Sequence, residues 1–269
     1  MYEVEFYRDR NGKSEILEYL DELKEKDEMG KMTYFIYDSD KINLLKKAQP
    51  LNGTDVYSSS ANQNNFAITS YVYYTGAEAL SQTGKTIYGL LKTETDPAGG
   101  VTTYTYDAYG YVASIKNPLN KTITYTNNKL GWIKQEKTAK NYTTNNYYDR
   151  NGNLLKKILA NNETERYLYN FRNQITQKIE PKQYASGSDS ATYSTENILS
   201  STSSSYSATA HGYRYTYNTQ GLLTKETDPL GYEINYTYDG YGRNLTKTLP
   251  DAGVYQYSYD VMDRLTREH

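Results

Sequence analysis

Residues Ala79, Gly84, Lys85 and Thr86 have the types and spacing of a loose phosphate-binding loop. A working loop lies between a buried strand and a helix, and its backbone N–H groups surround the phosphates. The residues that follow, 87–95, instead have the pattern of a strand that recurs elsewhere in the chain. The sequence therefore predicts no nucleotide site at this position.

Asp149, Asn151 and Asn153 have the spacing of the first ligands of a calcium loop. The twelfth position of such a loop holds a Glu that binds the ion through both oxygens. This chain has Ala160 at that position. The three polar residues are better explained by a recurring turn, so the sequence predicts no metal site.

The sequence offers little histidine or cysteine chemistry. His211 and His269 are the only histidines, and the chain has no Cys. These residues cannot supply a histidine metal cluster, a cysteine ligand set or a Ser-His-Asp triad. Asp and Glu recur at turn positions and do not form the isolated pair of a glycosidase. We therefore expect no catalytic residue, no cofactor and no enzymatic activity.

These look-alike residues fall on a regular repeat, whose clearest copy is Tyr236–Gly242. In that copy two tyrosines precede an Asp, and a Gly follows the Asp three positions later. The Asp or Asn of each unit, here called its anchor, recurs at one constant step, which we call the repeat period. Such a period indicates one supersecondary unit used many times. The anchors are Asp107, Asn128, Asp149 and Asn170, and then Asn218, Asp239 and Asp260.

Each anchor is followed, three positions later, by a residue that favours tight turns. The Asp or Asn side chain can accept hydrogen bonds from backbone N–H groups ahead of it, and Gly then closes the turn without a Cβ clash. We therefore expect the anchors to shape turns and not to do chemistry. The turn-closing residues are Gly110, Gly131, Gly152, Asn173, Gly221, Gly242 and Asp263.

Tyrosines stand one and three positions before most anchors. Because side chains alternate along a strand, Tyr-x-Tyr places two rings on one face. Packing between such rings across strands is worth ~0.2–1 kcal/mol per pair. One unit is thus predicted to be strand, turn, strand, turn. The same rings could stack on sugars, and the candidate glycan-contact residues are Tyr215, Tyr217, Tyr236, Tyr238, Tyr257 and Tyr259.

The composition is typical of a β-sheet with at least one face exposed to water. The mean hydropathy is −0.87, yet the chain has 33 Tyr, and disordered segments are poor in aromatic residues. A net charge of −2 argues against a nucleic-acid partner. No run of apolar residues approaches the ~18 needed for a membrane span. The start of the chain lacks the basic and apolar regions of a signal peptide.

Residues 1–30 do not follow the repeat. The pattern predicts a strand over Tyr2–Tyr7 and then a helix whose apolar side includes Leu20 and Leu23. The amino-acid sequence resembles the start of RelE/HigB-like toxins of phage origin, which cleave mRNA, at Tyr2–Tyr7, Gly12–Ser14 and Glu18–Leu23. The resemblance covers about a tenth of the chain and omits the strands with that family's basic catalytic residues, so we expect a remnant without nuclease activity.

Residues 31–269 are predicted to be repeats, with two interruptions. The step from a first anchor at Asp38 to the next in-register position, Thr86, equals the step from Asn170 to Asn218. Each of these steps is longer than two repeat periods, and the extra stretch is rich in Ser, Thr and Asn. We expect long surface loops near 51–85 and 182–212.

The motif Tyr-x-Tyr-Asp-x-x-Gly-Arg-x-Leu, seen at Tyr236–Leu245 and in altered form at Tyr257–Leu265, resembles the YD repeat of Rhs and wall-associated proteins. The resemblance extends over about residues 32–269. It implies an all-β fold in which a repetitive antiparallel sheet spirals into a shell. In complete relatives the shell encloses a C-terminal toxin, and the proteins are secreted or displayed on the bacterial surface.

The chain departs from complete relatives in having few units, no region that ends the shell, no toxin domain and no export signal. We therefore expect a non-catalytic β scaffold that forms part of a shell, with the remainder of the shell or a toxin cargo as its partner. A cell-surface glycan-binding module is the alternative from the tyrosine ladders. A second alternative is the mRNA-cleaving remnant at residues 1–30.

Overall fold

The computed structural model shows an all-β protein, which confirms the predicted fold class. Within the described residues, no helix is long and apolar enough to cross a membrane. The chain divides into two compact units, residues 1–127 with 138–140, and residues 128–137 with 141–269. The structure describes residues 3–4, 22–26, 31–40, 42–52, 55–58, 63–78, 87–184, 187–189, 192–199, 206–208 and 212–268.

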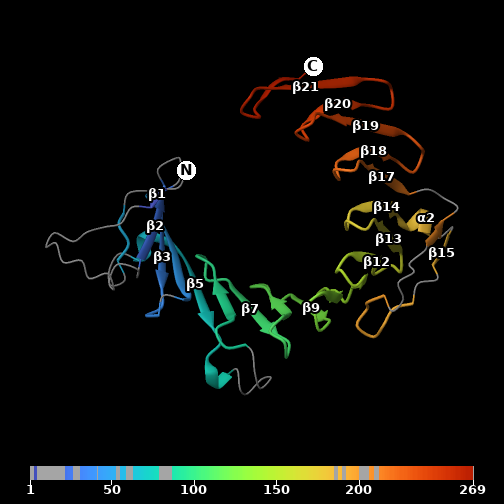
Figure 1. The fold of residues 1–269 in the computed structure, drawn as a ribbon. Helices are drawn as coiled ribbons and strands as arrows, with labels where there is room; N and C mark the ends of the chain where they lie inside the picture. Colours follow the sequence, from blue (N-terminus) through green and yellow to red (C-terminus); the bar gives the residue numbers. More distant parts are fainter. Residues whose placement is uncertain are drawn as a thin grey trace. The chain divides into compact units, whose positions relative to one another are not determined.

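The first unit is an antiparallel sheet in which each described strand pairs with the next one along the chain (Figure 1). A short 3-10 helix, η1 (Gln63–Asn65), precedes β5. The strands are β1 (Glu3–Val4), β2 (Glu22–Lys26), β3 (Met32–Tyr37), β4 (Leu44–Pro50), β5 (Phe66–Tyr73), β6 (Leu91–Thr95), β7 (Val101–Tyr106), β8 (Val112–Lys116) and β9 (Thr122–Asn127).

The second unit is also an antiparallel sheet of sequential neighbours, except that β14 pairs with β17. The segment between those two strands contains α2 (Pro181–Tyr184) and a separate pair of strands. The strands are β10 (Ile133–Lys137), β11 (Thr143–Tyr148), β12 (Leu154–Ile158), β13 (Thr164–Tyr169), β14 (Ile175–Ile179), β15 (Gly187–Asp189), β16 (Tyr206–Ala208), β17 (Tyr213–Tyr217), β18 (Leu223–Thr227), β19 (Glu233–Tyr238), β20 (Asn244–Thr248), β21 (Val254–Tyr259) and β22 (Leu265–Glu268).

Each repeat is a β-hairpin with the anchor in its turn. In the β7–β8 hairpin, Thr105 pairs with Ser114 and Tyr106 with Val112, so the register shifts just before the anchor Asp107. Such a shift is a β-bulge, which bends and twists the hairpin locally. The same shift recurs before the turns that follow Tyr37, Tyr73, Tyr148, Tyr169, Tyr217, Tyr238 and Tyr259.

The prediction of one long loop near 51–85 is wrong in its middle, because β5 lies within that stretch. Among the described residues, Tyr57 from the segment before β5 packs on Tyr34, Ala48 and Phe66, all at most 6% exposed. Three ring pairs in this cluster have centroids 5.4–6.1 Å apart. The inserted segment therefore supplies a small local core over β3–β5.

In the β5–β6 hairpin, Tyr74 takes the position that an Asp or Asn anchor has in the other hairpins. Thr86, the residue predicted there by counting, lies outside the described residues. The Tyr74 N–H donates to the Leu90 carbonyl at 2.9 Å, and the Gly89 N–H donates to the Tyr74 carbonyl at 3.0 Å. They are equivalent to the two backbone bonds of Asp107, whose N–H donates to the Tyr111 carbonyl and whose carbonyl accepts from the Gly110 N–H. The extra residues of this hairpin therefore follow Tyr74 inside the turn, where counting by the repeat period could not place them.

The second interruption, where a long loop near 182–212 is predicted, lies between β14 and β17. Its described part also contains structure: β15 pairs with β16, and Tyr193 forms an isolated bridge with Leu199. In Figure 1, α2 and β15 lie beside β13 and β14. We call residues 180–212 the insertion.

The helix predicted near the N-terminus is wrong at Leu23, because this residue lies in β2, which pairs with β3. The strand predicted over Tyr2–Tyr7 includes β1, and apart from β1 and β2 residues 1–30 lie outside the described residues. Of the apolar side of the predicted helix, only Leu23 is described, and its pairing with Phe35 of β3 decides for a strand at that residue.

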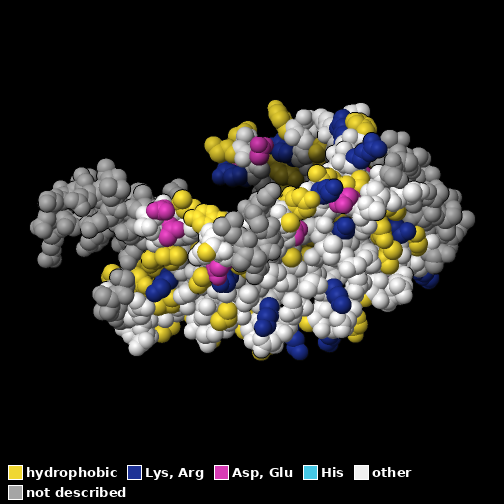
Figure 2. Space-filling model, turned by 90° about the horizontal axis from the view of Figure 1, so that it is seen from below, with side chains coloured by type: hydrophobic (Ala, Val, Ile, Leu, Met, Phe, Trp, Pro, Cys, Tyr) yellow, Lys and Arg dark blue, Asp and Glu magenta, His cyan; other side chains and the backbone are white. Residues whose placement is uncertain are grey.

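The described surface has apolar side chains in several separate groups, with Lys and Arg side chains between them, on the face that Figure 2 presents. Most strand residues are half-buried, and few described side chains are fully buried. This pattern fits a sheet with water on much of both faces, where Tyr can bury its ring and keep its hydroxyl bonded.

Candidate functional site

The side chain of each anchor organises its turn. In the Asp107 turn, Oδ1 accepts hydrogen bonds from the N–H groups of Tyr109 and Tyr111 at 2.9 and 3.0 Å. The Gly110 N–H donates to the Asp107 carbonyl at 3.1 Å. The side chains of Asn128, Asp149, Asn170, Asn218, Asp239 and Asp260 accept the same two bonds.

The residue three positions after each anchor has a left-handed backbone. Its φ is 86° at Gly110, 89° at Gly152 and 61° at Asn173. Gly adopts such angles without steric cost, and Asn tolerates them better than most residues. At Gly152 a Cβ atom would also lie 2.8 Å from the Trp132 ring, so both the angle and the neighbour require Gly.

The second carboxylate oxygen is bonded as well at several Asp anchors. Asp239 Oδ2 accepts from Arg243 Nε at 2.6 Å, and Asp260 Oδ2 accepts from Arg264 Nε at 2.7 Å. Partial desolvation raises the pKa of Asp239, but hydrogen bonds from Arg243 and the backbone outweigh it, so the pKa is lowered. The backbone and side-chain bonds from Arg264 lower the pKa of Asp260.

The tyrosine just before most anchors ties neighbouring hairpins together. The Tyr106 hydroxyl donates to the Leu91 carbonyl at 2.7 Å, and the Tyr238 hydroxyl donates to the Leu223 carbonyl at 2.7 Å. Each acceptor is the first residue of the second strand in the preceding repeat. We call this bond the tyrosine clamp. It also forms from Tyr73, Tyr148, Tyr169 and Tyr217.

Asn127, which replaces Tyr at this position, preserves the clamp. Its side-chain amide donates to the Val112 carbonyl at 2.9 Å and to Asp107 Oδ2 at 3.1 Å. Tyr and Asn share little except a hydrogen-bond donor at the end of the side chain. Both residue types at this position therefore supply a donor that reaches the previous hairpin.

The six candidate glycan-contact tyrosines do not form one cluster. Tyr217 and Tyr238 are clamps whose hydroxyls donate to backbone carbonyls. Tyr215 pairs with Glu226 across β17 and β18, and burial, with the nearby Glu226 carboxylate, raises the pKa of Tyr215. Tyr236 has a raised pKa for the same two reasons.

The remaining two candidate tyrosines lie on β21. Burial raises the pKa of Tyr257, and the Glu268 carboxylate paired with it adds to the shift. The Tyr259 ring lies 5.1 Å from the Arg243 guanidinium, which also lies 5.2 Å from the Tyr241 ring. Tyr257 and Tyr259 thus have charged neighbours, and these contacts do not define a cleft.

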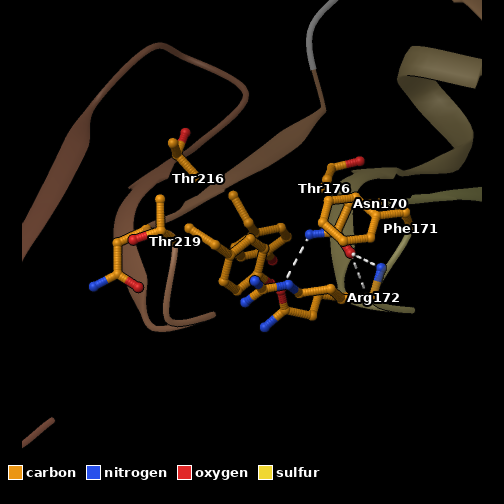
Figure 3. Close-up of a pocket in the computed structure, with 10 residues that line it drawn as sticks. Asn170, Phe171, Arg172, Thr176, Thr216 and Thr219 are labelled. Carbon is orange, nitrogen blue, oxygen red and sulfur yellow. Dashed lines mark hydrogen bonds between the residues drawn. The ribbon is translucent and has the colours of Figure 1, made fainter.

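A cavity of about 410 Å³ between the β13–β14 turn and β17 includes two of the six, Tyr215 and Tyr217, in its lining. Figure 3 shows Phe171, Arg172 and Thr176 on the β14 side, and Thr216 on the β17 side. The Phe171 ring is 89% exposed, with the Arg172 guanidinium 5.4 Å from its centre. At this cavity two of the predicted tyrosines adjoin a hollow in the described structure.

The calcium look-alike is a repeat turn in the structure. Asp149 Oδ1 accepts from the N–H groups of Asn151 and Asn153, and Oδ2 accepts from the Asn153 amide at 2.7 Å. Both Asn side chains also donate to Asn173 of the next turn. Among the described residues, no three His, Cys, Asp or Glu side chains are placed to hold a metal ion. The phosphate-loop residues and both histidines lie outside the described residues.

A family model described as RHS Repeat matches residues 88–122 and 217–252. Both matches include an anchor turn, its left-handed Gly and a tyrosine clamp. The chain carries RHS repeats.

Several solved toxin structures resemble this chain. One is a TcdB2-TccC3-TEV crystal structure, at 16% identity and a TM-score of 0.44 over 97% of this chain and 11% of that chain. Another is the Photorhabdus luminescens Tc holotoxin pore, at 16% identity and a TM-score of 0.44 over 91% of this chain and 10% of that chain. The chain thus spans about a tenth of the solved chains it matches. No curated protein matches it.

Reasoning from the sequence did not find how the RHS repeats are joined to one another. The clamp has a signal that could have revealed it, because the position before the anchor holds Tyr or Asn and both carry a donor. The contacts made by the insertion have no such signal. Tyr184 and Tyr193 stand in a Ser- and Thr-rich stretch without periodicity.

Proposed function

We propose that the chain is a segment of a non-catalytic RHS-repeat wall, within a larger shell that encloses and delivers a polypeptide cargo. The observation that carries this proposal is that the side chains offered for chemistry are bonded to the sheet itself. The anchor oxygens accept from turn N–H groups, and the tyrosine hydroxyls donate to carbonyls of the preceding hairpin.

The state of the anchor carboxylates supports a structural role. A general acid or base needs a pKa near the working pH and a free path to the substrate. Asp239 and Asp260 have lowered pKa values and use both oxygens in hydrogen bonds. Such carboxylates stay ionised at neutral pH and act as fixed acceptors.

The repeat construction supports a place within a larger wall. Each clamp joins one hairpin to the preceding one, so further units can be added by the same bond. The similar solved structures include a TcdB2-TccC3 structure and a Tc holotoxin pore. By analogy, the partners of this segment are further shell repeats and a cargo, and the place of action is outside the producing cell or at its surface.

A pair of variants at Asp149 tests the structural role of the anchors. Asn already serves as an anchor at Asn128, Asn170 and Asn218, so Asp149→Asn should keep the free energy of unfolding within about 0.5 kcal/mol. Asp149→Ala removes the acceptor for two N–H groups and should cost about 1–2 kcal/mol. Urea unfolding measures both. An equal loss in the two variants would contradict the turn role.

Encapsulation is tested in the longest natural polypeptide that contains this segment. Limited proteolysis should leave an enclosed cargo intact under conditions that digest the same cargo expressed alone. Tyr106→Ala with Tyr238→Ala, which removes two clamps, should open the wall and make the cargo cleavable. Equal cleavage of the free and the attached cargo would overturn encapsulation but leave the repeat architecture standing.

A second candidate function, glycan contact, is favoured by the cavity beside the exposed Phe171 ring. Aromatic faces with nearby hydroxyl and amide groups suit sugar rings. A glycan array with the chain and with Phe171→Ala tests it. Binding lost in the variant would support the role, and an array without binding to the folded chain would remove it.

A further inference from the structure

The cavity between the β13–β14 turn and β17 combines one cation with aromatic surface. Among the described residues that line it, Arg172 is the one with a charge, and no Asp or Glu takes part. The Phe171 ring beside it is 89% exposed, and Tyr215 and Tyr217 add two further rings to the lining. The cavity therefore offers a guanidinium and ring faces to the same ligand.

The Arg172 side chain extends from its own turn toward the next repeat (Figure 3). A Cβ atom on Gly221, in the β17–β18 turn, would lie 3.3 Å from Arg172 Nη1. Within the described part of the chain, the guanidinium forms no hydrogen bond or ion pair, and its contact is with the Phe171 ring, 5.4 Å from the ring centre. A guanidinium carries five N–H donors, so this site lacks an acceptor for them.

The amide oxygens of the lining are already used, which leaves donors facing the cavity. The Asn218 oxygen accepts from the N–H groups of Gln220 and Leu222 at 3.0 and 2.9 Å, and its amide nitrogen has no bond to a described residue. The oxygens of Asn170 and Gln174 likewise accept bonds within their own turn. Free donors suit a ligand that is rich in acceptors.

A second guanidinium of the same sheet shows what such a group binds at this edge. Arg243 donates to Asp239 Oδ2 at 2.6 Å and to Asp263 Oδ1 at 2.8 Å. Asp239 is the anchor of its own turn, and Asp263 closes the turn of the next repeat. Gly221 holds the place of Asp263 beside Arg172. The chain thus supplies its own carboxylates to one arginine and not to the other.

The two residues that could neutralise Arg172 carry no charge. Its anchor is Asn170, and the next turn is closed by Gly221, which has no side chain. A planar guanidinium binds a planar carboxylate through two parallel N–H···O bonds. The cavity beside Arg172 therefore fits a carboxylate that comes from outside the chain.

We propose that this cavity binds an acidic sugar, with the sugar carboxylate on Arg172 and one face of the sugar ring on Phe171. The inference rests on glycan contact as the function of this cavity, and it names the class of glycan. Aromatic faces with a few placed polar groups are typical of small-ligand sites. An acidic peptide side chain would bond Arg172 and leave the rings unused, so the structure favours a sugar.

Glucuronate and glucose are matched probes, because they differ at one carbon, which carries a carboxylate in one and a CH₂OH group in the other. NMR titration of the full chain should show saturable shifts at residues 170–176 and 215–219 with glucuronate. The expected dissociation constant is on the order of millimolar, and glucose should bind at least ~10-fold more weakly.

The outcomes of this titration separate the two levels of the argument. Equal affinity for both sugars would overturn the acidic sugar and leave glycan contact standing. No binding of either sugar to the folded chain would remove glycan contact as well, without affecting the wall proposal. N-acetyl-aspartate amide that binds as tightly as glucuronate would overturn the proposal in favour of an acidic peptide.

A pair of arginine variants tests the contact at Arg172. Arg172→Gln should weaken glucuronate binding at least ~10-fold and change glucose binding little. Arg150→Gln is the matched control, since it removes the same charge at an exposed residue outside the lining. It should bind glucuronate within about twofold of the unaltered chain at physiological salt, because a distant charge is screened. Equal losses in the two variants would assign the attraction to net charge and overturn the proposal.

An internal carboxylate gives a second test that leaves Arg172 in place. Gly221→Asp puts a carboxylate where Asp263 stands in the Arg243 site, and Gly221→Asn adds the same bulk without charge. Asn173 and Asp263 already have φ of 61° and 63° at this turn position, so both variants keep the turn. Gly221→Asp should bind glucuronate at least ~5-fold more weakly than Gly221→Asn. Equal binding in this pair would overturn the proposal.

Discussion

Two regions of the second unit use the same repeated hairpin and differ in what lies on one face. In the covered repeats, β11–β14, Tyr184 and Tyr193 of the insertion lie against Lys156, on the face that cross-strand pairing continues through Arg166 and Ile179. In the bare repeats, β17–β22, cross-strand pairing continues the same face through Gln177, Arg214, Lys225 and Asn235. That face carries the exposed side chains of Thr216, Thr237 and Gln256.

Equivalent leucines in the two regions differ in burial. Leu155 and Leu245 each stand six residues after an Asp anchor. Leu155 is 3% exposed, whereas Leu245 is 38% exposed. The turns before them are the same in outline, with two N–H groups bonded to the anchor in each case. The same local turn chemistry therefore forms the hairpin whether the leucine that follows is buried or partly exposed.

The repeat does not need a second layer to form its register. The bare hairpins β17–β18 and β19–β20 keep the bulge, the left-handed Gly and the tyrosine clamp. The face under the insertion carries buried Arg166 and Ile179, whereas the same face of the bare repeats carries exposed Thr and Gln side chains together with the buried Thr227. In a repeat protein each unit is stabilised by its own bonds and by its neighbours, so local additions of this kind are tolerated.

The largest effect that would sharpen this contrast is expected at the paired leucines. Leu155→Ala removes a fully buried side chain and should lower the free energy of unfolding by about 2–4 kcal/mol. Leu245→Ala removes a partly exposed one and should cost less than about 1 kcal/mol. Urea unfolding followed by circular dichroism measures both variants against the unaltered chain. Equal costs would mean that the burial of Leu155 adds no more to stability than the partly exposed position of Leu245.

The turns could be predicted from the sequence because their physics is local. Asp or Asn at the anchor and Gly three positions later specify the same turn wherever they occur. Period counting also gave the total length of each interruption, but not its position inside the repeat. Thr86 stands at the counted position, whereas Tyr74 holds the anchor position in the structure, and the extra residues are divided between the segment from β4 to β5 and the turn after Tyr74.

The contacts between hairpins and insertion could not be predicted. Lys156 is one of several lysines in a strand pattern. Its sequence neighbours do not indicate that its ammonium lies near the rings of Tyr147, Tyr184 and Tyr193. The spacing of apolar residues predicts a helix at Leu23, whereas this residue pairs with Phe35 of β3 in the sheet. Long-range contacts decide these features, and a single sequence does not display them.

A second prediction compares two equivalent turn residues within the bare repeats. Gly231 and Ala252 stand one repeat period apart, with φ of 92° and 66°. A left-handed backbone is strained for Ala and not for Gly, so Ala252→Gly should raise the free energy of unfolding by about 1 kcal/mol. Gly231→Ala should lower it by a similar amount, since no atom lies within 4 Å of the added Cβ. Urea midpoints that move in the same direction would contradict strain as the cause.

A third prediction concerns the tyrosine clamp in the two regions. Tyr238→Phe removes the donor to the Leu223 carbonyl and should cost about 1 kcal/mol. Tyr148→Phe should cost less, because the Ile133 carbonyl that it bonds also accepts from the Asn146 amide at 3.0 Å. Thermal unfolding of the two variants gives the order. A larger loss at Tyr148 would show that the covered repeats depend more on the clamp than its geometry indicates.

The smallest effect expected is a pH dependence confined to Asp-anchored turns of the bare repeats. The pKa values of Asp239 and Asp260 are lowered from 3.8 in the folded chain, so these groups contribute stability that is present above that value and is lost as the pH falls through the folded pKa. Amide exchange should therefore quicken at the Asp239 turn between pH 4 and about 2 more than at the Asn218 turn, which has no titrating anchor. Asp239→Asn should abolish the difference, and salt should reduce it because the Arg243 ion pair is partly exposed. A difference that persists in Asp239→Asn would assign the acid sensitivity to another group.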